Sequence, residues 1–346
     1  MRARQHDGRA LLPDLGSAID RASRYIVEMQ APNGAWPDFN LAVGRSDTWT
    51  TAYIGWCLFE TEPIVRAPER HYLRGALERA AQFLKASRRA DGSWGYNTRV
   101  PSDSDSTSWA ALFLTSMGSA PGSETDRILQ TFARSDGGFA TYNTGASDTV
   151  AASAWTRSHP DVTPLVVRAL AAPSATREKA LAFIASQRRD DGLWNSYWYR
   201  TPLYATLHNL AALEAAGRPA IPPALAILAA AVDRDPFDRA LALEIVARFG
   251  SGPTAAFVFD VAAALLETQS AEGWWAAKPM LRVTYDDVER PWELPGEAGG
   301  PLHDDDYFLF TTATVARALS LMMRERSSSD DVPNGAHSPN RKETIT

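Results

Sequence analysis

Cysteine is almost absent from this chain. Its 346 residues contain one cysteine, Cys57, which excludes an internal disulfide and is natural for a reducing compartment. Long apolar runs are also missing, and without a run of ~18 apolar residues the sequence predicts no membrane-spanning helix. The polar residues 1–8 contain no apolar signal-peptide core. We therefore expect a cytoplasmic protein.

A surplus of positive charge is lacking as well. The formal net charge is −6 and no block of lysine and arginine occurs, which argues against nucleic acid as a partner. Hydrophobic residues make up 45% of the chain, enough for a large core. Tryptophan is abundant, with 11 residues, and a helical protein needs a structural or chemical reason for so many.

One short pattern recurs along the chain: an amphipathic helix, a polar turn with glycine, and then an aromatic residue. Glycine suits the left-handed residue that ends a helix, and we expect the aromatic side chain to fold back against the helix that it follows. Repeats of this length are typical of stacked helical pairs. The five occurrences are Gly34-Ala-Trp36, Gly92-Ser-Trp94, Gly137-Gly-Phe139, Gly192-Leu-Trp194 and Gly273-Trp274.

Hydrophobic periodicity predicts twelve helices of two alternating kinds. The amphipathic ones, expected to form an outer ring, are 15–29, 70–88, 123–134, 175–188, 222–232 and 254–269. The others carry less charge, as buried helices do, and are 48–60, 105–117, 161–172, 200–216, 236–249 and 306–324. This alternation predicts an all-α fold, a single closed (α/α)6 barrel over residues 15–326. Residues 1–14 are then an N-terminal segment, and 327–346 form a polar, disordered tail.

Two acidic residues stand where a loop turns into a buried helix. Asp103 and Asp105 lie in the segment 101–109, directly before the apolar run 110–114. Burial raises the pKa of a carboxyl group, because the charged form loses its hydration. An acid kept protonated beside an apolar interior suits an enzyme that protonates a weak base such as a carbon–carbon double bond. The alternative is that Ser104 or Asp105 is only a helix cap in an acidic loop.

These features together resemble the squalene–hopene and oxidosqualene cyclases. The repeats resemble the Gln…Gly-x-Trp repeats of that family, and 103–107 (Asp-Ser-Asp-Ser-Thr) resembles the Asp-x-Asp-Asp-Thr motif of class II terpene cyclases. Residues 306–309 (Asp-Tyr-Phe-Leu) are similar to the family's closing Asp-aromatic-aromatic-Leu element. The resemblance runs from about residue 15 to 324. It implies a squalene cyclase/prenyltransferase-like barrel. This chain has helices for one barrel domain, whereas the family usually has two.

The resemblance also implies a reaction. A class II terpene or meroterpenoid cyclase protonates the terminal alkene (or epoxide) of a prenyl chain and closes rings through carbocation intermediates. Asp105 is then the catalytic acid, and Asp103 is the second carboxyl of the site. The expected partner is a small prenyl or prenylated-aromatic substrate.

Two positions depart from the family's pattern. Ser106 stands where the fourth motif residue is normally aspartate, and Leu165 stands where the family often places a histidine that bonds the acid. We expect Ser106 and Thr107 to offer hydroxyl groups that support the acid, with His159 as a candidate to replace the missing histidine.

Aromatic side chains of the predicted inner helices are the expected lining of a substrate cavity. Each aromatic face stabilises a desolvated cation by about 1–2 kcal/mol. Ordinary core packing is an equal alternative for any single one of them. The candidates, with one histidine, are Trp49, Tyr53, Trp56, Trp109, Trp198, Tyr204, His208, Trp292, Tyr307, Phe308 and Phe310.

Two other segments leave alternatives open. The run 303–306 (His-Asp-Asp-Asp) could hold a metal, but a solvated loop with a helix cap is the favoured interpretation. We therefore expect no cofactor, and Mg²⁺ only if the substrate carries a diphosphate. The uncharged segment 221–232 could touch a membrane surface, pack on a partner subunit or lie under a loop. The oligomeric state is not predicted.

Two further functions fit the same barrel. One is a non-catalytic barrel that binds a lipid or isoprenoid. The other is a prenyltransferase-type subunit, which needs a zinc ion held by Asp, Cys and His. Cys57 lies in the first predicted inner helix without a suitable Asp-x-Cys spacing, which disfavours the second alternative.

Overall fold

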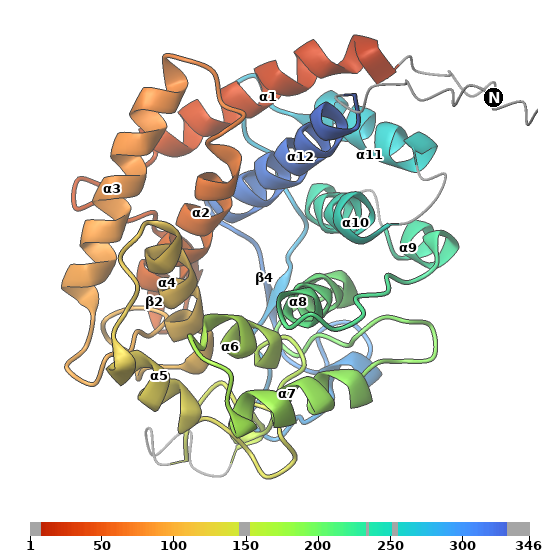
Figure 1. Cartoon of the computed structure of the whole chain (residues 1–346). Helices are drawn as coiled ribbons and strands as arrows, with labels where there is room; N and C mark the ends of the chain where they lie inside the picture. The colour runs from red at the N-terminus through yellow and green to blue at the C-terminus, as the bar shows by residue number, and fades with distance from the viewer. Residues whose placement is uncertain (1–7, 145–152, 233–234, 251–254, 331–346) are drawn as a thin grey trace, which may run out of the picture.

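The helices form two concentric rings. The computed structural model describes residues 8–144, 153–232, 235–250 and 255–330, and within them the chain alternates between outer and inner helices (Figure 1). The outer helices are α1 (Gly8–Glu28), α3 (Glu69–Ser87), α5 (Ser123–Gln130), α7 (Ala175–Ser186), α9 (Leu225–Ala231) and α11 (Ala255–Thr268). The inner helices are α2 (Thr48–Thr61), α4 (Ser104–Ser116), α6 (Thr163–Ala169), α8 (Pro202–Ala215), α10 (Pro236–Phe249) and α12 (Leu309–Asp330).

The inner ring is closed. Each inner helix contacts the next one along the chain, and α12 packs against both α10 and α2, so the last inner helix joins the first. These helices are buried on nearly all sides: α2, α8 and α12 each carry threonine, alanine and aromatic residues at buried positions. The predicted all-α (α/α)6 barrel is confirmed.

The repeated glycine–aromatic turn locks each outer helix to the next inner helix. The indole N–H of Trp36 donates to the Ile26 carbonyl near the end of α1 (2.8 Å), while its backbone N–H donates to the Thr51 hydroxyl on α2 (2.7 Å). Equivalent pairs of bonds are made by Trp94, Trp194 and Trp275, and Phe139 makes the backbone bond alone. The predicted folding-back of the aromatic residue is therefore confirmed.

The glycine of this turn has a conformation that other residues rarely adopt. Gly34 has φ +92°, and a Cβ atom there would stand 2.5 Å from the carbonyl oxygen of Arg79. Both the positive φ and the lack of space explain why the repeat uses glycine.

The fifth turn differs from its prediction by one residue. The buried aromatic that bonds α11 and α12 is Trp275, not Trp274. Trp274 instead stacks on Phe308, with ring centroids 4.4 Å apart. The reason is spacing, since each of the other turns has one residue between its glycine and its aromatic, and Gly273-Trp274-Trp275 obeys the same rule.

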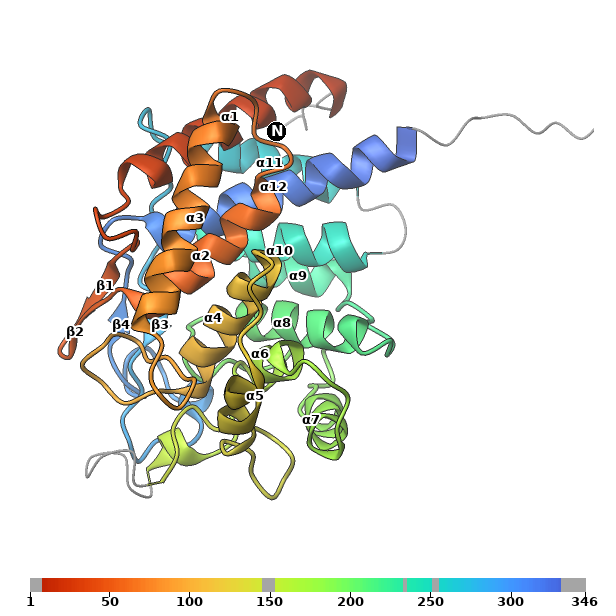
Figure 2. The same cartoon turned by 60° about the vertical axis from the view of Figure 1, so that its left-hand side comes forward.

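Four short strands gather at one end of the barrel (Figure 2). They are β1 (Asp38–Leu41) paired with β2 (Gly44–Ser46), and β3 (Leu281–Arg282) paired with β4 (Leu302–His303), both antiparallel. The helical periodicity did not reveal them, because each strand has at most four residues. They lie where the inner helices begin, and they form the wall of the mouth described below.

Most helix bounds match the predictions closely. The α5 helix ends at Gln130 rather than at 134, and α9 begins at Leu225 rather than at 222. The α6 helix starts at Thr163 and ends at Ala169, inside the predicted 161–172. The α1 helix begins at Gly8, within the predicted N-terminal segment. The α12 helix continues to Asp330, whereas most of the predicted tail lies outside the described residues.

Candidate active site

A cavity of about 360 Å³ opens at the strand-bearing end of the barrel. Its wall is mostly apolar and aromatic, and two carboxyl groups, those of Asp103 and Asp105, stand in it. The described lining residues are Leu41, Ala42, Val43, Trp49, Tyr96, Val100, Pro101, Asp103, Asp105, Ser106, Thr141, Tyr142, Trp155, Trp198, Tyr199, Leu281, Arg282, Val283, Pro301 and His303.

Extended segments that follow the repeated turns build this mouth. After Trp94 the chain runs along the segment before α4, where the Asp103 N–H donates to the Trp94 carbonyl (3.1 Å). The Ser104 N–H then donates to the Thr141 carbonyl of the next repeat (3.0 Å), and the Ser104 hydroxyl donates to the Ala140 carbonyl (2.6 Å). These bonds fix the start of α4, and with it the direction of the acidic motif, at the wall of the cavity.

Asp103 caps α4 and is held by one neighbour. The Ser106 N–H donates to its Oδ1 atom (2.6 Å) and the Ser106 hydroxyl donates to its Oδ2 atom (2.7 Å). Burial raises the pKa of Asp103 to about 6, and the Ser106 donors oppose that rise because they stabilise the anion. The cap of α4 is therefore Asp103 and not Ser104 or Asp105, and Ser106 bonds Asp103 rather than Asp105.

Asp105 is the strongest candidate for a protonated carboxyl group. It lies in the first turn of α4 and is half-buried, because its side chain faces the cavity rather than bulk solvent. Burial raises the pKa of Asp105 well above its ordinary value, and the nearby charges of Asp103 and Asp161 raise it further. The side chain of Trp49 opposes this rise in pKa, and its indole Nε1 atom is buried without a hydrogen-bond partner among the described residues.

A third acid stands behind the mouth. Asp161 lies before α6, and its Oδ2 atom accepts the backbone N–H groups of Tyr197 (2.7 Å) and Trp198 (2.8 Å). Its Oδ1 atom is buried without a hydrogen-bond partner. Burial raises the pKa of Asp161 to about 6, against the opposing effect of these donors and of Arg282. The sequence analysis gave Asp161 no chemical role.

Two predicted supporting residues have structural partners instead. The Thr107 hydroxyl donates to the Trp94 carbonyl (3.0 Å) and accepts the Trp94 N–H (3.1 Å), which is the helix lock found in the other repeats. His159 bonds the Thr141 hydroxyl (2.7 Å) and the Ala154 carbonyl (3.1 Å). Burial lowers the pKa of His159 to about 3, so its imidazole is neutral. Neither residue hydrogen-bonds Asp105 in the described structure.

Six tryptophan and tyrosine residues line the cavity. Trp49 and Trp198 were predicted to do so. Tyr96, Tyr142, Trp155 and Tyr199 were not, and all four lie outside the inner helices. Tyr96 and Tyr142 directly follow repeat turns, and that position was the available signal.

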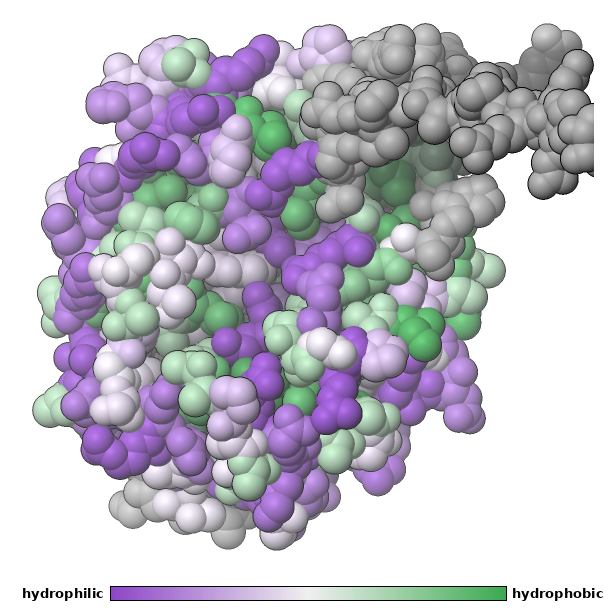
Figure 3. Space-filling view, in the orientation of Figure 1, coloured by the Kyte–Doolittle hydropathy of each residue, from purple (hydrophilic) through white to green (hydrophobic). Residues whose placement is uncertain are grey.

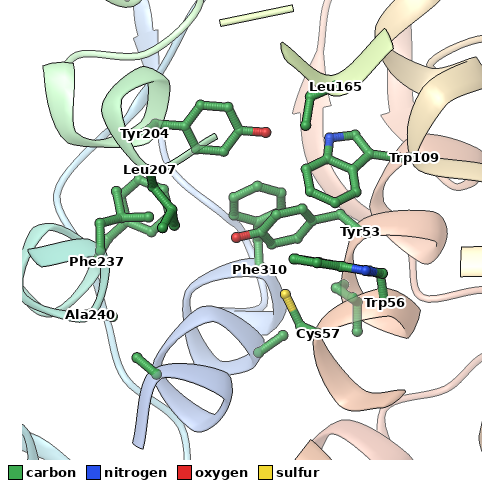
Figure 4. Close-up of a cluster of buried hydrophobic side chains, with 14 of the residues drawn as sticks. Tyr53, Trp56, Cys57, Trp109, Leu165, Tyr204, Leu207, Phe237, Ala240 and Phe310 are labelled. Atoms are coloured by element: carbon green, nitrogen blue, oxygen red, sulfur yellow. The ribbon is translucent and has the colours of Figure 1, made fainter. Parts of the chain in front are cut away.

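Other predicted lining residues fill the barrel below the cavity (Figure 4). Tyr53 stacks on Phe310 with ring centroids 3.9 Å apart and meets the edge of Trp109 at 4.9 Å. Tyr204 and the residues around it close the same cluster from the α8 side. Six of the predicted lining residues pack against one another in this structure rather than facing the cavity, because they lie deeper on the inner helices. They are Tyr53, Trp56, Trp109, Tyr204, His208 and Phe310.

Three further candidates lie away from the cavity. Tyr307 is 36% exposed, and the Arg45 guanidinium lies over its ring at 4.7 Å. Phe308 stacks on Trp274, and Trp292 is half-buried in the short 3-10 helix Pro291–Glu293. These residues precede α12 in connecting segments, where period-based reasoning cannot fix the direction of a side chain.

The segment before α12 uses its acids as caps. The Asp305 Oδ2 atom accepts the Thr311 N–H (2.7 Å), and Asp306 pairs with Arg45 (3.2 Å). Within the described residues, no group of three or more His, Cys, Asp or Glu side chains is placed to hold a metal ion. Two acids of the 303–306 run are therefore explained without a metal: Asp305 by its helix-cap bond and Asp306 by its ion pair with Arg45.

Buried charge closes the opposite end of the barrel. Arg317 of α12 pairs with Glu244 of α10, and both side chains are at most 3% exposed. The guanidinium groups of Arg317 and Arg168 lie over the Trp56 ring at 4.1 and 5.0 Å. Figure 3 shows this face, where hydrophilic residues gather near the centre.

Solved structures with similar folds include the type II terpene cyclase MstE from Scytonema. MstE matches 91% of this chain and all of its own chain, with 25% sequence identity and a TM-score of 0.78. A variant of MstE in complex with the substrate geranylgeranyl dihydroxybenzoate matches with a TM-score of 0.79.

Curated relatives match with lower coverage. Drimenyl diphosphate synthase from Streptomyces showdoensis is 35% identical over 34% of this chain, and its counterpart from Streptantibioticus cattleyicolor is 26% identical over 76% of it. The chain spans about half or less of these relatives, 21% and 53% of their lengths. No protein-family model matches the chain. These similarities confirm the resemblance drawn from the sequence, and the chain has the single-barrel fold of the type II terpene cyclases.

Proposed function

We propose that this protein is a class II terpene or meroterpenoid cyclase in which Asp105 is the proton donor. The observation that carries the proposal is a carboxyl group of raised pKa in the wall of an aromatic-lined cavity. A raised pKa favours the protonated form, which a general acid needs. The fold shared with MstE over nine-tenths of the chain supports the same chemistry.

The reaction begins when Asp105 gives its proton to the terminal alkene (or epoxide) of a prenyl chain. As the carboxyl O–H bond breaks, a new C–H bond forms at one alkene carbon while the π bond breaks, or an O–H bond forms at an epoxide oxygen while a ring C–O bond breaks. The neighbouring carbon becomes a cation. Trp49, which lowers the pKa of Asp105, favours the carboxylate that remains. Successive alkenes then attack the cation and close rings.

The cavity wall suits these cations. The faces of Trp49, Tyr96, Tyr142, Trp155, Trp198 and Tyr199 offer electron-rich surfaces. The reaction cascade ends when a carbon next to the cation loses a proton or when water adds to the cation. Because the reaction starts with a proton from a carboxylic acid, it needs no resident metal, and Mg²⁺ would enter only with a diphosphate substrate.

The proposed substrate is a small prenyl or prenylated-aromatic compound. MstE has been solved with geranylgeranyl dihydroxybenzoate, and the curated relatives are named for drimenyl diphosphate. A cavity of about 360 Å³ is within the range of small-molecule sites and has room for a prenyl chain.

Contact with a membrane surface through 221–232 is a second part of the proposal. Ile221 is 61% exposed, whereas Leu228 of α9 is buried. In Figure 3 the surface near α9 mixes hydrophobic and hydrophilic residues. No described helix is long and apolar enough to cross a membrane. Sedimentation with lipid vesicles, compared between wild type and Ile221→Glu, tests this contact.

The decisive experiment is turnover by Asp105→Asn. We expect wild-type protein to convert linear prenyl alcohols and prenylated benzoates into cyclic products, and Asp105→Asn to lose this activity by at least about 100-fold, as removal of a general acid does. Asp190→Asn, at an exposed position on the surface, serves as the matched control. Cyclisation retained by Asp105→Asn would refute the assignment, and bound prenyl compounds without any turnover would favour the non-catalytic barrel.

A further inference from the structure

Arg282 is a buried cation at the cavity wall without a direct partner. Its side chain is 5% exposed and it lies on β3 among the lining residues. Its Nε atom is buried without a hydrogen-bond acceptor, and no carboxylate of the described residues comes within 4.0 Å of its guanidinium. A guanidinium in such a place is costly, because its lost hydration is not replaced.

Other arginines around the same mouth are paired. Arg45 pairs with Asp306 at 3.2 Å, and Arg200 pairs with Asp238 at 3.2 Å. Arg134 donates to several backbone carbonyls, among them those of Thr156 and Tyr142. Arg282 differs from these three arginines, because no hydrogen bond or ion pair of its guanidinium group is found among the described residues.

The charge of Arg282 is balanced at a distance. The carboxylate of Asp161 raises the pKa of Arg282 while burial lowers it, so the two groups attract each other without contact. The Oδ2 atom of Asp161 is occupied by the N–H groups of Tyr197 and Trp198. Asp161 thus helps Arg282 to keep its charge but leaves the donors of the guanidinium free.

The position of Arg282 is fixed by the backbone around it. Its N–H donates to the Trp198 carbonyl (2.6 Å), and its strand pairs with β4, which carries His303, another lining residue. Asp105 stands on α4, on a different part of the wall. A ligand in the cavity can therefore meet the acid with one end and the β3–β4 pair with the other.

We infer that Arg282 binds an anionic head group of the substrate, a carboxylate or a phosphate, while the prenyl chain lies along the aromatic wall toward Asp105. A planar guanidinium with unused donors matches either anion, and the bond would be charge-assisted. The inference rests on the proposed function for the prenyl chain, but binding of the head group does not depend on turnover.

The test measures binding rather than catalysis. Tryptophan fluorescence reports ligands in this cavity, because Trp49, Trp155 and Trp198 line it. Each anionic ligand is paired with a neutral analogue: a prenylated hydroxybenzoate with its methyl ester, and a prenyl diphosphate with its prenyl alcohol. The diphosphate titration is repeated with Mg²⁺ and with a chelator, so that the two kinds of head group are distinguished.

We expect the wild-type protein to bind at least one anionic ligand about 10- to 100-fold more tightly than its neutral analogue, the range for a hydrogen bond to a charged group. Arg282→Gln should lose this preference and bind the neutral analogue as before, and Arg282→Lys should keep part of it. Arg290→Gln, at an exposed position on the same segment, is the matched control.

Equal affinity of the wild type for the charged and neutral ligands would overturn the inference, and this comparison needs no variant to fold. An unchanged preference in folded Arg282→Gln would overturn it as well. The outcomes are separate from those for Asp105: a protein that prefers anionic ligands but never cyclises them would refute the proposed function and leave the role of Arg282 standing.

Discussion

The hydroxyl of Thr107 offers the sharpest test of how the acidic motif is built. From the sequence it was expected to support the acid, but in the structure it bonds the backbone of Trp94. Thr206 makes the same bond to the Trp194 N–H (3.0 Å) in a repeat that contains no acidic motif. Replacement of either threonine by valine removes the hydroxyl and keeps the branched shape.

The size of the effect follows from the hydrogen bonds that remain. In Thr107→Val the Trp94 carbonyl still accepts the Asp103 N–H (3.1 Å), so one group, the Trp94 N–H, loses its partner. Trp94 is fully buried, and an unsatisfied buried donor costs about 1–3 kcal/mol. Against a total stability of about 5–15 kcal/mol, such a loss is readily measured.

The assay is urea unfolding followed by circular dichroism, together with the pH dependence of cyclisation. We expect both valine variants to lose about 1–3 kcal/mol of unfolding free energy with unchanged m-values. We also expect the alkaline limb of the pH profile to stay where it is in Thr107→Val, because the pKa of Asp105 is set by burial, Asp103, Asp161 and Trp49.

Two results would refute this reasoning. If Thr107→Val unfolds like the wild type while Thr206→Val is destabilised, the lock at Trp94 is not what the structure shows. If the alkaline limb moves in Thr107→Val but not in Thr206→Val, the Thr107 hydroxyl acts on the acid, as the sequence analysis expected.

Two further predictions concern charge. The acid works only while protonated, so activity falls as pH rises through the pKa of Asp105; Asp103→Asn removes a charge that raises this pKa, and we expect the alkaline limb of the pH–rate profile to move to lower pH. At the other end of the barrel, Glu244→Gln leaves the buried Arg317 without its partner and should cost about 3–5 kcal/mol in denaturant unfolding. Glu293→Gln, which breaks an exposed pair, should cost less than about 1 kcal/mol. A loss for Glu244→Gln as small as that control, or an alkaline limb that stays fixed in Asp103→Asn, would contradict these expectations.

The barrel could be predicted because the patterns that define its helices and turns lie in residues close together in the chain. Periodic apolar positions define each helix, and a glycine followed by an aromatic marks each turn. The error at Trp274 arose where two tryptophans stand side by side and only the hydrogen bonds to Leu265 and Thr312 distinguish them. The short strands escaped notice because β3 and β4, of two residues each, carry no periodicity.

The position of the acidic motif was predicted as well, but the contacts of its two carboxyl groups were not. The sequence placed Asp103 and Asp105 at the start of a buried helix, and the structure agrees. It could not show that Ser106 bonds Asp103, or that Asp161 comes close enough to raise the pKa of Asp105. Both depend on directions of side chains and on contacts between repeats, which no local pattern records.

The sequence by itself determined the ring of paired helices, the glycine–aromatic turns and the position of the acidic motif, because each of these depends on residues close together in the chain. Only the tertiary structure decided which aromatic residues face the cavity and which fill the barrel beneath it. It alone brought Arg282 to the wall that also holds Asp105. The physical reason is that a cavity exists between elements far apart in sequence, and its lining is fixed by how those elements pack.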